Sequence, residues 1–411
     1  MVMLSLILFV YYEVMKKKQV LIVGGGFSGV KSALNLSKNE AYKVTLLSDR
    51  DSFFYYPTLY RTATGGSREI SDIPLAQIFK DKPVEIVLGK ADKLNREKRT
   101  IHTVDGNKFD YDILILALGA VTNYFGIRGM KEYSYGIKSI EEAEELKAHL
   151  HNQLIDTRKP DLNYIIIGGG PTGIELAGAM PSYVKKIMKQ HGLRDRKIHV
   201  DLVEAAPRLM PRMPKNVSKA FAKRLKKLGV KLYLGTPVQA ETANTLLMNG
   251  KYVRSHTVVW TAGIANNPFF KSNNFILSPS GKVQVDKLLQ AWPGIFVIGD
   301  NADTPYAGMA QTALHDAHFV SENLHRHSLK KQPYAYKPKK PIYITPAGPY
   351  WAAVVWGPLR MYGWLGWALR RAADWLGYKD VGPWWKATEL VLGAFDNEDK
   401  CARCTQASTS N

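Results

Sequence analysis

Two copies of a glycine-rich turn constrain the fold of this 411-residue chain more than any other feature. In the second copy, an apolar run from Tyr164 to Ile167 leads into Gly168, Gly170 and Gly173, and a helix of small residues follows. In this spacing the first glycine permits a tight turn, the second lets backbone N–H groups approach a diphosphate, and the third lets the helix pack closely on the strand. The pattern therefore predicts an α/β unit that binds a dinucleotide.

An acidic residue closes the next predicted strand of this unit. The run Ile198 to Val203 ends at Glu204, where a carboxylate accepts a hydrogen bond from a ribose 2′-hydroxyl and disfavours a 2′-phosphate. A basic stretch, Tyr183 to Lys197, makes the interval longer than usual. The alternative is a glycine-rich loop that binds nothing, but strand, helix and acid occur in the order that binding requires.

The first copy follows the buried-strand run Lys18 to Val23 and places Gly24, Gly26 and Gly29 in the same spacing. The next strand ends at Asp49, at about the expected interval for a ribose contact, and Ser48 is the alternative.

Two later apolar runs end in small residues. The first closes at Gly119, and the second ends at Gly299 and Asp300 before a helix predicted over Ala310 to His325. The return of such a strand after the second turn indicates that the first domain resumes, so one nucleotide-binding domain is inserted in another. The expected boundaries are an extension over 1–14, a first domain over 15–130 and 276–335, an inserted domain over 131–275, a C-terminal region over 336–390, and a polar tail over 391–411.

Charge and cysteine content narrow the function classes. Lys and Arg exceed Asp and Glu by 56 − 36 = 20, which favours an anionic partner, either nucleic acid or a lipid surface, although the basic clusters are equally typical of solvated helix faces. The only cysteines, Cys401 and Cys404, lie in the polar tail, so a disulfide scaffold is excluded and no complete four-ligand metal site is expected. Residues 1–14 are apolar but shorter than the roughly 20 residues of a membrane span, and are read as either an extension or a peripheral anchor.

The order of these motifs resembles the two-dinucleotide-fold flavoprotein disulfide reductase superfamily. It is carried by both glycine turns, the run ending at Gly119, Trp260 to Gly263, and Gly299-Asp300. Four shorter stretches look more specifically like type II NADH:quinone oxidoreductases: Asn123 to Ile127, Ser139 to Ala143, Gly173 to Leu176, and Ala310 to Ala313. The resemblance implies two Rossmann-like domains in an α/β fold, with FAD in the first and NADH in the inserted one.

In such flavoproteins the flavin passes electrons to a disulfide, a sulfide-handling cysteine set, oxygen or a quinone. Residues 1–400 contain no cysteine, so both thiol routes lack a nucleophile unless the tail with Cys401 and Cys404 reaches the flavin. Oxygen and a quinone remain as acceptors, and the resemblance implies a quinone. The resemblance places Glu175 near the nicotinamide and flavin as a proton-relay residue, although a carboxylate near a helix start also balances the helix dipole. Gln311 resembles a quinone-site glutamine, whereas His315-Asp316 replaces the family's following glutamine pair; Tyr60 and Arg61 match the same site loosely.

Seven of the nine tryptophans lie between Trp351 and Trp385, mixed with basic residues. A helix is expected over Leu359 to Leu376, with Arg360, Arg370, Arg371 and Asp374 on one side and apolar residues opposite. This pattern is typical of a helix that lies on a membrane surface, and a core or dimer helix is the alternative.

These features predict an FAD-dependent respiratory-chain enzyme that oxidises NADH, reduces a membrane quinone without pumping protons, and docks on an anionic membrane at its cytoplasmic face. Nucleic acid is not an expected partner, and a homodimer is compatible with the sequence. The competing hypothesis is a redox-sensing protein that resembles apoptosis-inducing factor and acts through partner binding.

Overall fold

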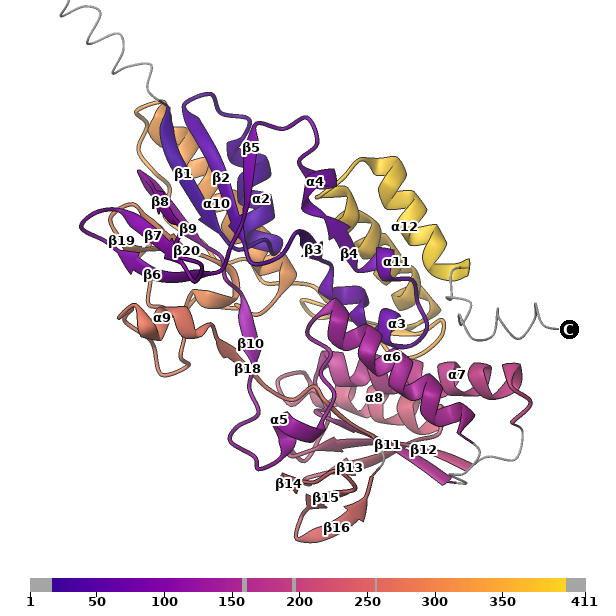
Figure 1. Cartoon of the computed structure of the whole chain (residues 1–411). Coiled ribbons are helices and arrows are strands. Elements are labelled where there is room, and N and C mark those ends of the chain that lie inside the picture. Colours follow the sequence, from indigo (N-terminus) through magenta and orange to yellow (C-terminus); the bar gives the residue numbers. More distant parts are fainter. Residues whose placement is uncertain (1–16, 157–160, 194–196, 256, 397–411) are drawn as a thin grey trace, which may run out of the picture. The chain divides into compact units, whose positions relative to one another are not determined.

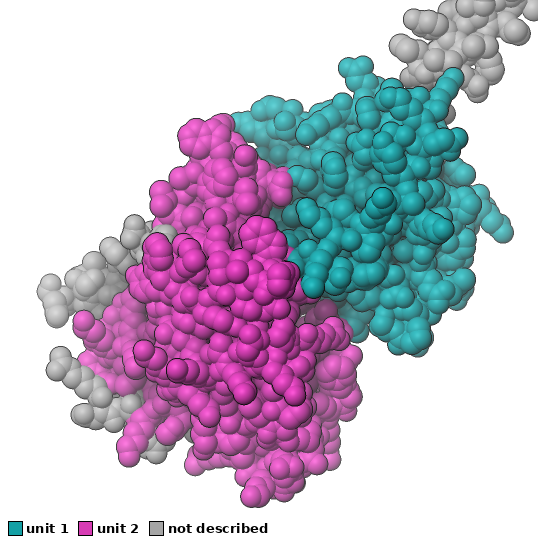
Figure 2. All heavy atoms as spheres, turned by 180° about the vertical axis from the view of Figure 1, so that it is seen from behind, with its two compact units in different colours: residues 1–53, 73–121, 265–341 teal, residues 54–72, 122–264, 342–411 magenta. Residues whose placement is uncertain are grey.

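The structure of the protein is a computed structural model that describes residues 17–156, 161–193, 197–255 and 257–396. Predictions for residues 1–14 and for Cys401 and Cys404 lie outside this part of the chain. The described residues form two compact units, each assembled from three separate stretches of sequence (Figure 2). Unit 1 contains 17–53, 73–121 and 265–341, and unit 2 contains 54–72, 122–264 and 342–396.

Unit 1 is built on a six-stranded sheet in the order β19-β20-β9-β1-β2-β5 (Figure 1). Its strands are β1 (Lys18–Val23), β2 (Tyr42–Ser48), β5 (Val84–Leu88), β9 (Ile113–Leu116), β19 (Gln290–Trp292) and β20 (Ile295–Val297). All neighbours are parallel except β19 and β20. Adjacent residues such as Leu21 and Ile22 are both buried, which explains why β1 reads as a continuous apolar run and not as an alternating one.

Two helices of unit 1, α2 (Phe27–Leu36) and α10 (Ala310–Ser328), pack against each other beside this sheet (Figure 1). The Tyr42 hydroxyl on β2 donates to the Leu324 carbonyl on α10 over 2.6 Å, which joins helix and sheet. The remaining elements of unit 1 are α4 (Leu75–Ile78), α9 (Pro268–Ser272), the 3-10 turn η3 (Gly299–Asn301), and the antiparallel strands β6 (Ala91–Asn95), β7 (Thr100–Thr103) and β8 (Lys108–Asp110).

Unit 2 contains a four-stranded parallel sheet in the order β13-β12-β11-β17. Its strands are β11 (Asp161–Ile167), β12 (Lys197–Glu204), β13 (Val230–Leu234) and β17 (Thr257–Trp260). Helices α6 (Ile140–Ile155), α7 (Pro171–Gln190) and α8 (Lys215–Lys227) contribute to one large apolar core with this sheet. Smaller elements are α5 (Met130–Tyr133) and the antiparallel strands β14 (Val238–Glu241), β15 (Thr245–Met248) and β16 (Lys251–Arg254).

Helix α7 joins the small residues after the second glycine turn to the start of the basic stretch. It begins at Pro171, continues through Pro181 and ends at Gln190, so the first part of the basic stretch that lengthens the interval to Glu204 belongs to the helix itself. A Cβ added to Gly178 would lie 2.4 Å from the backbone nitrogen of Gly348, which shows how closely the C-terminal chain packs on α7.

The C-terminal region of unit 2 consists of β21 (Tyr343–Pro346), β22 (Ala352–Trp356), β23 (Leu359–Gly363), α11 (Trp364–Lys379) and α12 (Trp384–Asp396). The helix predicted from Leu359 is wrong at its start, because Leu359–Gly363 pairs with β22 as a hairpin. Gly357 and Gly363 have φ of 55° and 84°, values that favour glycine and allow the turn and the break before α11. The predicted helix already began after Gly357, so periodicity missed only the break at Gly363.

Short elements lie near the points where the chain passes between the units. They are β3 (Ser52–Phe54), η1 (Tyr56–Thr58), α3 (Leu59–Ala63), η2 (Arg68–Ile70), β4 (Asp72–Pro74), β10 (Ala120–Thr122) and β18 (Ile264–Asn266). Residues 54–72 and the C-terminal strands and helices cluster with unit 2, whereas the sequence pattern grouped 54–72 with the first domain. Among the described helices, none combines the length and the apolar character that a membrane crossing requires.

Glu241, the last residue of β14, is an unusual buried acid in unit 2. Its side chain is 5% exposed, and its Oε2 has no hydrogen-bond partner among the described residues. Burial raises the pKa of this carboxyl from 4.5 to about 8. The folded protein therefore holds a proton on Glu241 at pH values where the unfolded chain has released it.

We expect this proton to make stability depend on pH. Because the folded pKa lies above the unfolded one, the contribution is fully present below about pH 4.5 and is lost as pH rises through about 8. Glu241→Gln should remove this loss and raise the melting temperature relative to wild type at alkaline pH. Calorimetry from pH 5 to 9 measures it, with exposed Glu132→Gln as control; parallel curves for wild type and Glu241→Gln would contradict the account.

Candidate functional site

The first glycine turn joins β1 to α2 in unit 1. Gly24 has φ of +116°, and a Cβ added there would lie 2.3 Å from the Ala117 carbonyl oxygen. A Cβ on Gly29 would lie 1.8 Å from the Gly24 oxygen, whereas one on Gly26 would meet no atom within 4 Å. The outer glycines are therefore required for packing, and the middle one borders open space.

The second turn repeats this geometry between β11 and α7 in unit 2. Gly168 has φ of +117°, a Cβ on Gly173 would lie 1.9 Å from the Gly168 oxygen, and one on Gly170 would meet nothing within 4 Å. Open space at the middle glycine of both turns fits a diphosphate approached by backbone N–H groups.

Both turns end at a helix start that suits an anion. Gly26 and Gly170 are the N-cap residues of α2 and α7, and neither makes a side-chain cap. The first turn of each helix also contains no acidic residue, so the positive end of each helix dipole is not balanced locally.

Glu204 lies at the end of β12, beside the second turn. Its Oε2 accepts from the Gly169 amide over 2.6 Å, and its Oε1 accepts from the Ala206 amide over 2.7 Å. These bonds fix the carboxylate, while each oxygen keeps acceptor capacity for a hydroxyl. The side chain is thus part of the turn, and it can still accept a hydrogen bond from a hydroxyl group.

Arg208 is the first basic residue after Glu204, and an arginine at such a position could bind a 2′-phosphate. Its guanidinium instead donates to its own loop: Nη1 reaches the Met213 carbonyl over 2.6 Å and the Ser218 hydroxyl over 2.8 Å, and Nη2 reaches the Pro211 carbonyl. The Met210 amide donates to the Gly169 carbonyl over 2.9 Å, which joins this loop to the turn. The guanidinium of Arg208 therefore stabilises the loop, and its Nη atoms already have hydrogen-bond acceptors within the protein.

In unit 1, Asp49 follows β2 and is exposed, paired with Arg50 Nε at 3.1 Å. Ser48 is buried, and a Cβ added to Gly25 would lie 2.4 Å from its hydroxyl. Of the two residues proposed for the first ribose, Asp49 is the one open to a ligand.

Gly119 and η3 are brought beside the first turn. The Gly119 amide donates to Asn301 Oδ1 over 2.8 Å, and Asn301 Nδ2 donates back to the Gly119 carbonyl over 2.8 Å. A Cβ on Gly299 would lie 2.5 Å from the Ser28 hydroxyl on α2. The sequence did not lead us to predict a role for Asn301. Its position directly after Gly299-Asp300 was the signal that could have identified it.

Asp316 on α10 holds the start of η3 in place. Its Oδ2 accepts from the Gly299 amide over 3.0 Å, and its Oδ1 accepts from the Tyr336 hydroxyl over 2.6 Å. Burial raises the pKa of Asp316 to about 6, while these hydrogen bonds act in the opposite direction. His315 and Asp316, which stand where the family has a glutamine pair, both make contacts within unit 1. The His315 ring contacts the Lys337 carbonyl at 2.9 Å, and Asp316 holds the turn at Gly299-Asp300.

Gln311 and Glu175 lie in different units. Gln311 is an exposed residue in the first turn of α10 in unit 1. Glu175 lies in the second turn of α7 in unit 2, and the first turn of that helix carries no acid, so simple dipole balance is a poor account of it.

Glu175 is held by a buried arginine that sequence analysis did not assign to the site. Arg370 of α11 donates through Nη1 to Glu175 Oε1 at 3.1 Å and through Nε to Asp374 Oδ1 at 3.0 Å. Nη1 also reaches the Ile344 carbonyl over 3.1 Å, and Nη2 reaches the Pro57 carbonyl over 2.5 Å. Helical spacing placed Arg370 and Asp374 on one side of α11, but that side faces the protein and not water.

Burial raises the pKa of Glu175 from 4.5 to about 7, whereas the charge and hydrogen bond of Arg370 lower it. Arg61, also in unit 2, acts on Glu175 in the same direction as Arg370, and its Nε donates to the Tyr60 hydroxyl over 2.9 Å. A carboxyl with this pKa exchanges a proton near neutral pH.

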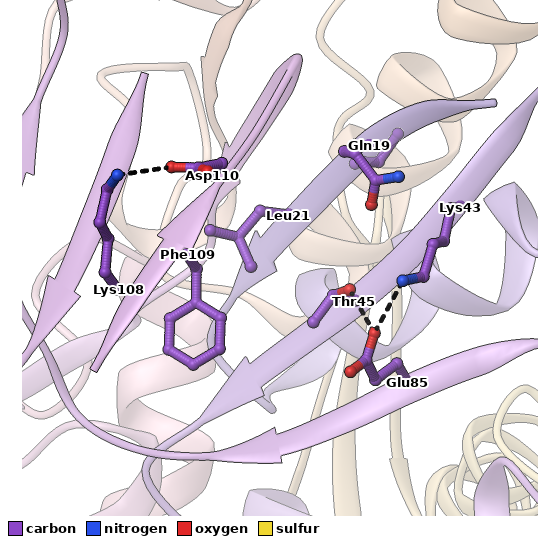
Figure 3. A pocket seen from close by; sticks show the side chains of 9 residues that line it. Gln19, Leu21, Lys43, Thr45, Glu85, Lys108, Phe109 and Asp110 are labelled. Carbon is purple, nitrogen blue, oxygen red and sulfur yellow. Dashed lines mark hydrogen bonds and ion pairs between the residues drawn. The ribbon is translucent and has the colours of Figure 1, made fainter. Parts of the chain in front are cut away.

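A shallow pocket in unit 1 lies elsewhere (Figure 3). It is lined by residues of β1, β2 and β5, among them Gln19, Thr45 and Glu85, and by all three residues of β8. The glycine turn follows the opposite, carboxyl end of β1, where open α/β sheets bind their ligands. This pocket is therefore separate from the turn.

Comparisons with known proteins agree with this geometry. Residues 18–317 match the family model described as pyridine nucleotide-disulphide oxidoreductase. A type II NADH:quinone oxidoreductase of Staphylococcus aureus is 26% identical over 334 residues, covering 75% of this chain and 82% of the relative.

Solved structures share the fold. NDH2 of Plasmodium falciparum, solved in complex with NADH, superposes with a TM-score of 0.83 at 18% identity, covering 92% of this chain and 98% of that one. A sulfide:quinone oxidoreductase of Aquifex aeolicus gives 0.74 at 20% identity, covering 92% of each chain. These comparisons confirm the predicted α/β fold and the resemblance drawn from the motifs. Because the family model spans well over half of the sequence, the chain belongs to the pyridine nucleotide-disulphide oxidoreductase family.

Proposed function

We propose that this chain is an FAD-dependent NADH:quinone oxidoreductase that does not pump protons. The observation that carries the proposal is the pair of matching turns, each open at its middle glycine, with the titratable Glu175 directly after the second. The name of the Staphylococcus relative supports the choice of quinone.

The FAD site belongs to unit 1 in this proposal. FAD, when bound, supplies the carrier that takes two electrons from NADH and passes them on. The open space at Gly26 fits its diphosphate, and the unpartnered start of α2 fits the negative charge. The residues proposed to hold it are Gly24, Gly26, Gly29, Asp49, Gly119, Gly299 and Asp300.

The NADH site belongs to unit 2. Gly168, Gly170 and Gly173 form the diphosphate turn, and Glu204 accepts from the adenosine ribose. The guanidinium of Arg208 donates to groups of its own loop and is therefore not directed at a 2′-phosphate. The proposal therefore names NADH and not NADPH.

Quinone reduction requires a proton relay. A quinone takes up two electrons and two protons, whereas NADH delivers two electrons with one proton, so one further proton comes from solvent. Glu175, with a pKa of about 7, holds and releases a proton at physiological pH. Gln311 is the proposed quinone contact.

The acceptor is a quinone and not a thiol or sulfide. The fold shared with a sulfide:quinone oxidoreductase leaves that chemistry open, but residues 1–400 contain no cysteine to carry it.

The C-terminal helices are proposed to dock peripherally on an anionic membrane, at the cytoplasmic face. Helix α11 buries Arg370, Arg371 and Asp374 and exposes apolar side chains, which is the reverse of a solvated surface helix. Large exposed apolar residues gather over this region: Tyr350, Trp356, Leu359, Tyr362, Trp364, Leu365, Leu376, Trp384, Trp385 and Leu392. Aromatic belts of this kind suit a bilayer interface.

Glu204→Gln should narrow the preference for NADH over NADPH. The change keeps the size of the side chain but removes the charge that repels a 2′-phosphate and weakens the ribose contact. We expect the ratio of kcat/KM values to fall by about tenfold, which corresponds to roughly 1.4 kcal/mol. Arg208→Lys is the comparison, because loosening the loop should weaken both dinucleotides alike. An unchanged ratio in Glu204→Gln would remove Glu204 from the recognition site.

Glu175→Gln should retain FAD and slow turnover. The substitution preserves size but removes the titratable group, and general acid–base groups contribute about 10²–10⁴-fold. We expect kcat to fall at least tenfold and the inflection near pH 7 to disappear from its pH profile. The control is Glu145→Gln, an exposed acid on α6. Wild-type rates across the pH range would show that Glu175 does not relay protons.

A triple variant in which Trp364, Trp384 and Trp385 are each changed to Ser should no longer bind anionic vesicles. These side chains are 65%, 61% and 61% exposed, so the fold does not depend on burying them, whereas a truncation before Tyr350 would also remove buried strand β22 and Arg370. Reduction of FAD by NADH and activity with a short-tail quinone should persist, while activity with long-tail quinone in vesicles falls.

Tyr252→Ser is the matched control, since this aromatic is 75% exposed on β16 of the same unit. Salt should weaken vesicle binding of the wild type only in part, because burial of tryptophan persists when charge attraction is screened. Full vesicle binding by the triple variant would leave these residues as an ordinary protein surface.

A further inference from the structure

The buried ion pair at Glu175 involves two carboxylates that share one guanidinium. Arg370 contacts Glu175 Oε1 at 3.1 Å and Asp374 Oδ1 at 3.0 Å. The side chains of Arg370, Asp374 and Glu175 are 6%, 3% and 12% exposed, so solvent screens these charges little. The charge on one carboxylate therefore changes how strongly Arg370 stabilises the charged form of the other.

Asp374 also fixes the direction of Arg370. The two residues lie one helical turn apart on α11, and Asp374 takes the Nε side of the guanidinium. The Pro57 and Ile344 carbonyls hold the Nη atoms, which leaves Nη1 directed at Glu175. Together these acceptors match the planar fork of the guanidinium and favour one orientation of it.

We propose that Asp374 is a positioning residue for Glu175 and acts on it through Arg370. The inference rests on the proposed role of Glu175 in proton transfer. Without Asp374, the guanidinium would serve Glu175 alone and hold it as a carboxylate. With Asp374, part of that positive charge is offset, and Glu175 can accept a proton near neutral pH.

Other charged and titratable groups also lie around Glu175, Arg370 and Asp374. Arg61, from α3, lowers the proton affinity of Glu175, as Arg370 does, and Asp374 raises it. The Tyr55 hydroxyl lies 3.5 Å from Asp374 Oδ1, the same oxygen that accepts from Arg370 Nε. Arg371 and Tyr378, also on α11, contact other groups: Arg371 donates to the Val391 carbonyl, and the Tyr378 hydroxyl donates to the Ile70 carbonyl over 2.5 Å.

The test compares two substitutions with opposite expected effects. Asp374→Asn removes a negative charge near Glu175, so the pKa of Glu175 should fall, by about one unit. Arg370→Met removes the positive charge, so the pKa should rise. The kcat pH profile of the FAD-containing enzyme should move in these two directions, with Asp380→Asn, an exposed acid just beyond α11, as the control for loss of charge.

An infrared pH titration of the holoenzyme without substrate reads the same shift directly. The carboxylic acid C=O band that Glu175→Gln removes identifies Glu175, and its midpoint should move down in Asp374→Asn and up in Arg370→Met. If Asp374→Asn does not fold, Arg370→Lys carries the test, because a lysine keeps the charge but cannot hold both carboxylates and both carbonyls, and the midpoint should rise.

An unchanged midpoint in Asp374→Asn, or shifts of the same sign in Asp374→Asn and Arg370→Met, would overturn the inference. If the infrared midpoint shifts as expected but the kinetic profile does not follow, the action of Asp374 on Glu175 stands and the proton-relay role in the proposed function fails. The two failures are thus distinguished.

Discussion

The buried guanidinium of Arg370 joins several elements of unit 2 through ion pairs and hydrogen bonds. Removing a charge from water costs several kcal/mol unless partners replace the solvent, and Arg370 has two carboxylates and two backbone carbonyls as partners. These partners come from α7, α11, β21 and η1, so one side chain joins four elements of unit 2. A neutral replacement would leave Glu175 and Asp374 buried without their shared cation.

This arrangement also explains the unusual surface of α11. Because its charged side is occupied by Arg370, Arg371 and Asp374 in the interior, the side left outside is apolar. The same helix therefore presents Trp364, Leu365 and Leu376 outward and supplies the counterion of Glu175 inward. The proposed membrane surface and the proposed proton-transfer residue are thus linked through a single helix of unit 2.

The glycine turns were predictable because their requirements are local. Strand, G-x-G-x-x-G and helix are adjacent in sequence, and Gly24, Gly29, Gly168 and Gly173 occupy positions where a Cβ would overlap backbone atoms. Glu204 could be found because it ends a strand at a known place relative to the turn. Arg370 could not be found as a partner of Glu175, since 195 residues separate them and an amphipathic pattern does not say which face meets water. Periodicity predicted a helix at Leu359–Gly363 and was wrong for a related reason, because pairing with β22 makes this segment a strand.

The central claim is that electrons pass rapidly from NADH through bound FAD to a quinone. Stopped-flow absorbance measures it: the FAD-containing enzyme is reduced anaerobically with one equivalent of NADH and then mixed with a soluble quinone. The account predicts that flavin absorbance returns at a rate at least as fast as steady-state turnover. A reduced flavin that persists with NAD⁺ bound, unaffected by quinone, would contradict the enzyme assignment and favour a redox sensor that acts through partner binding.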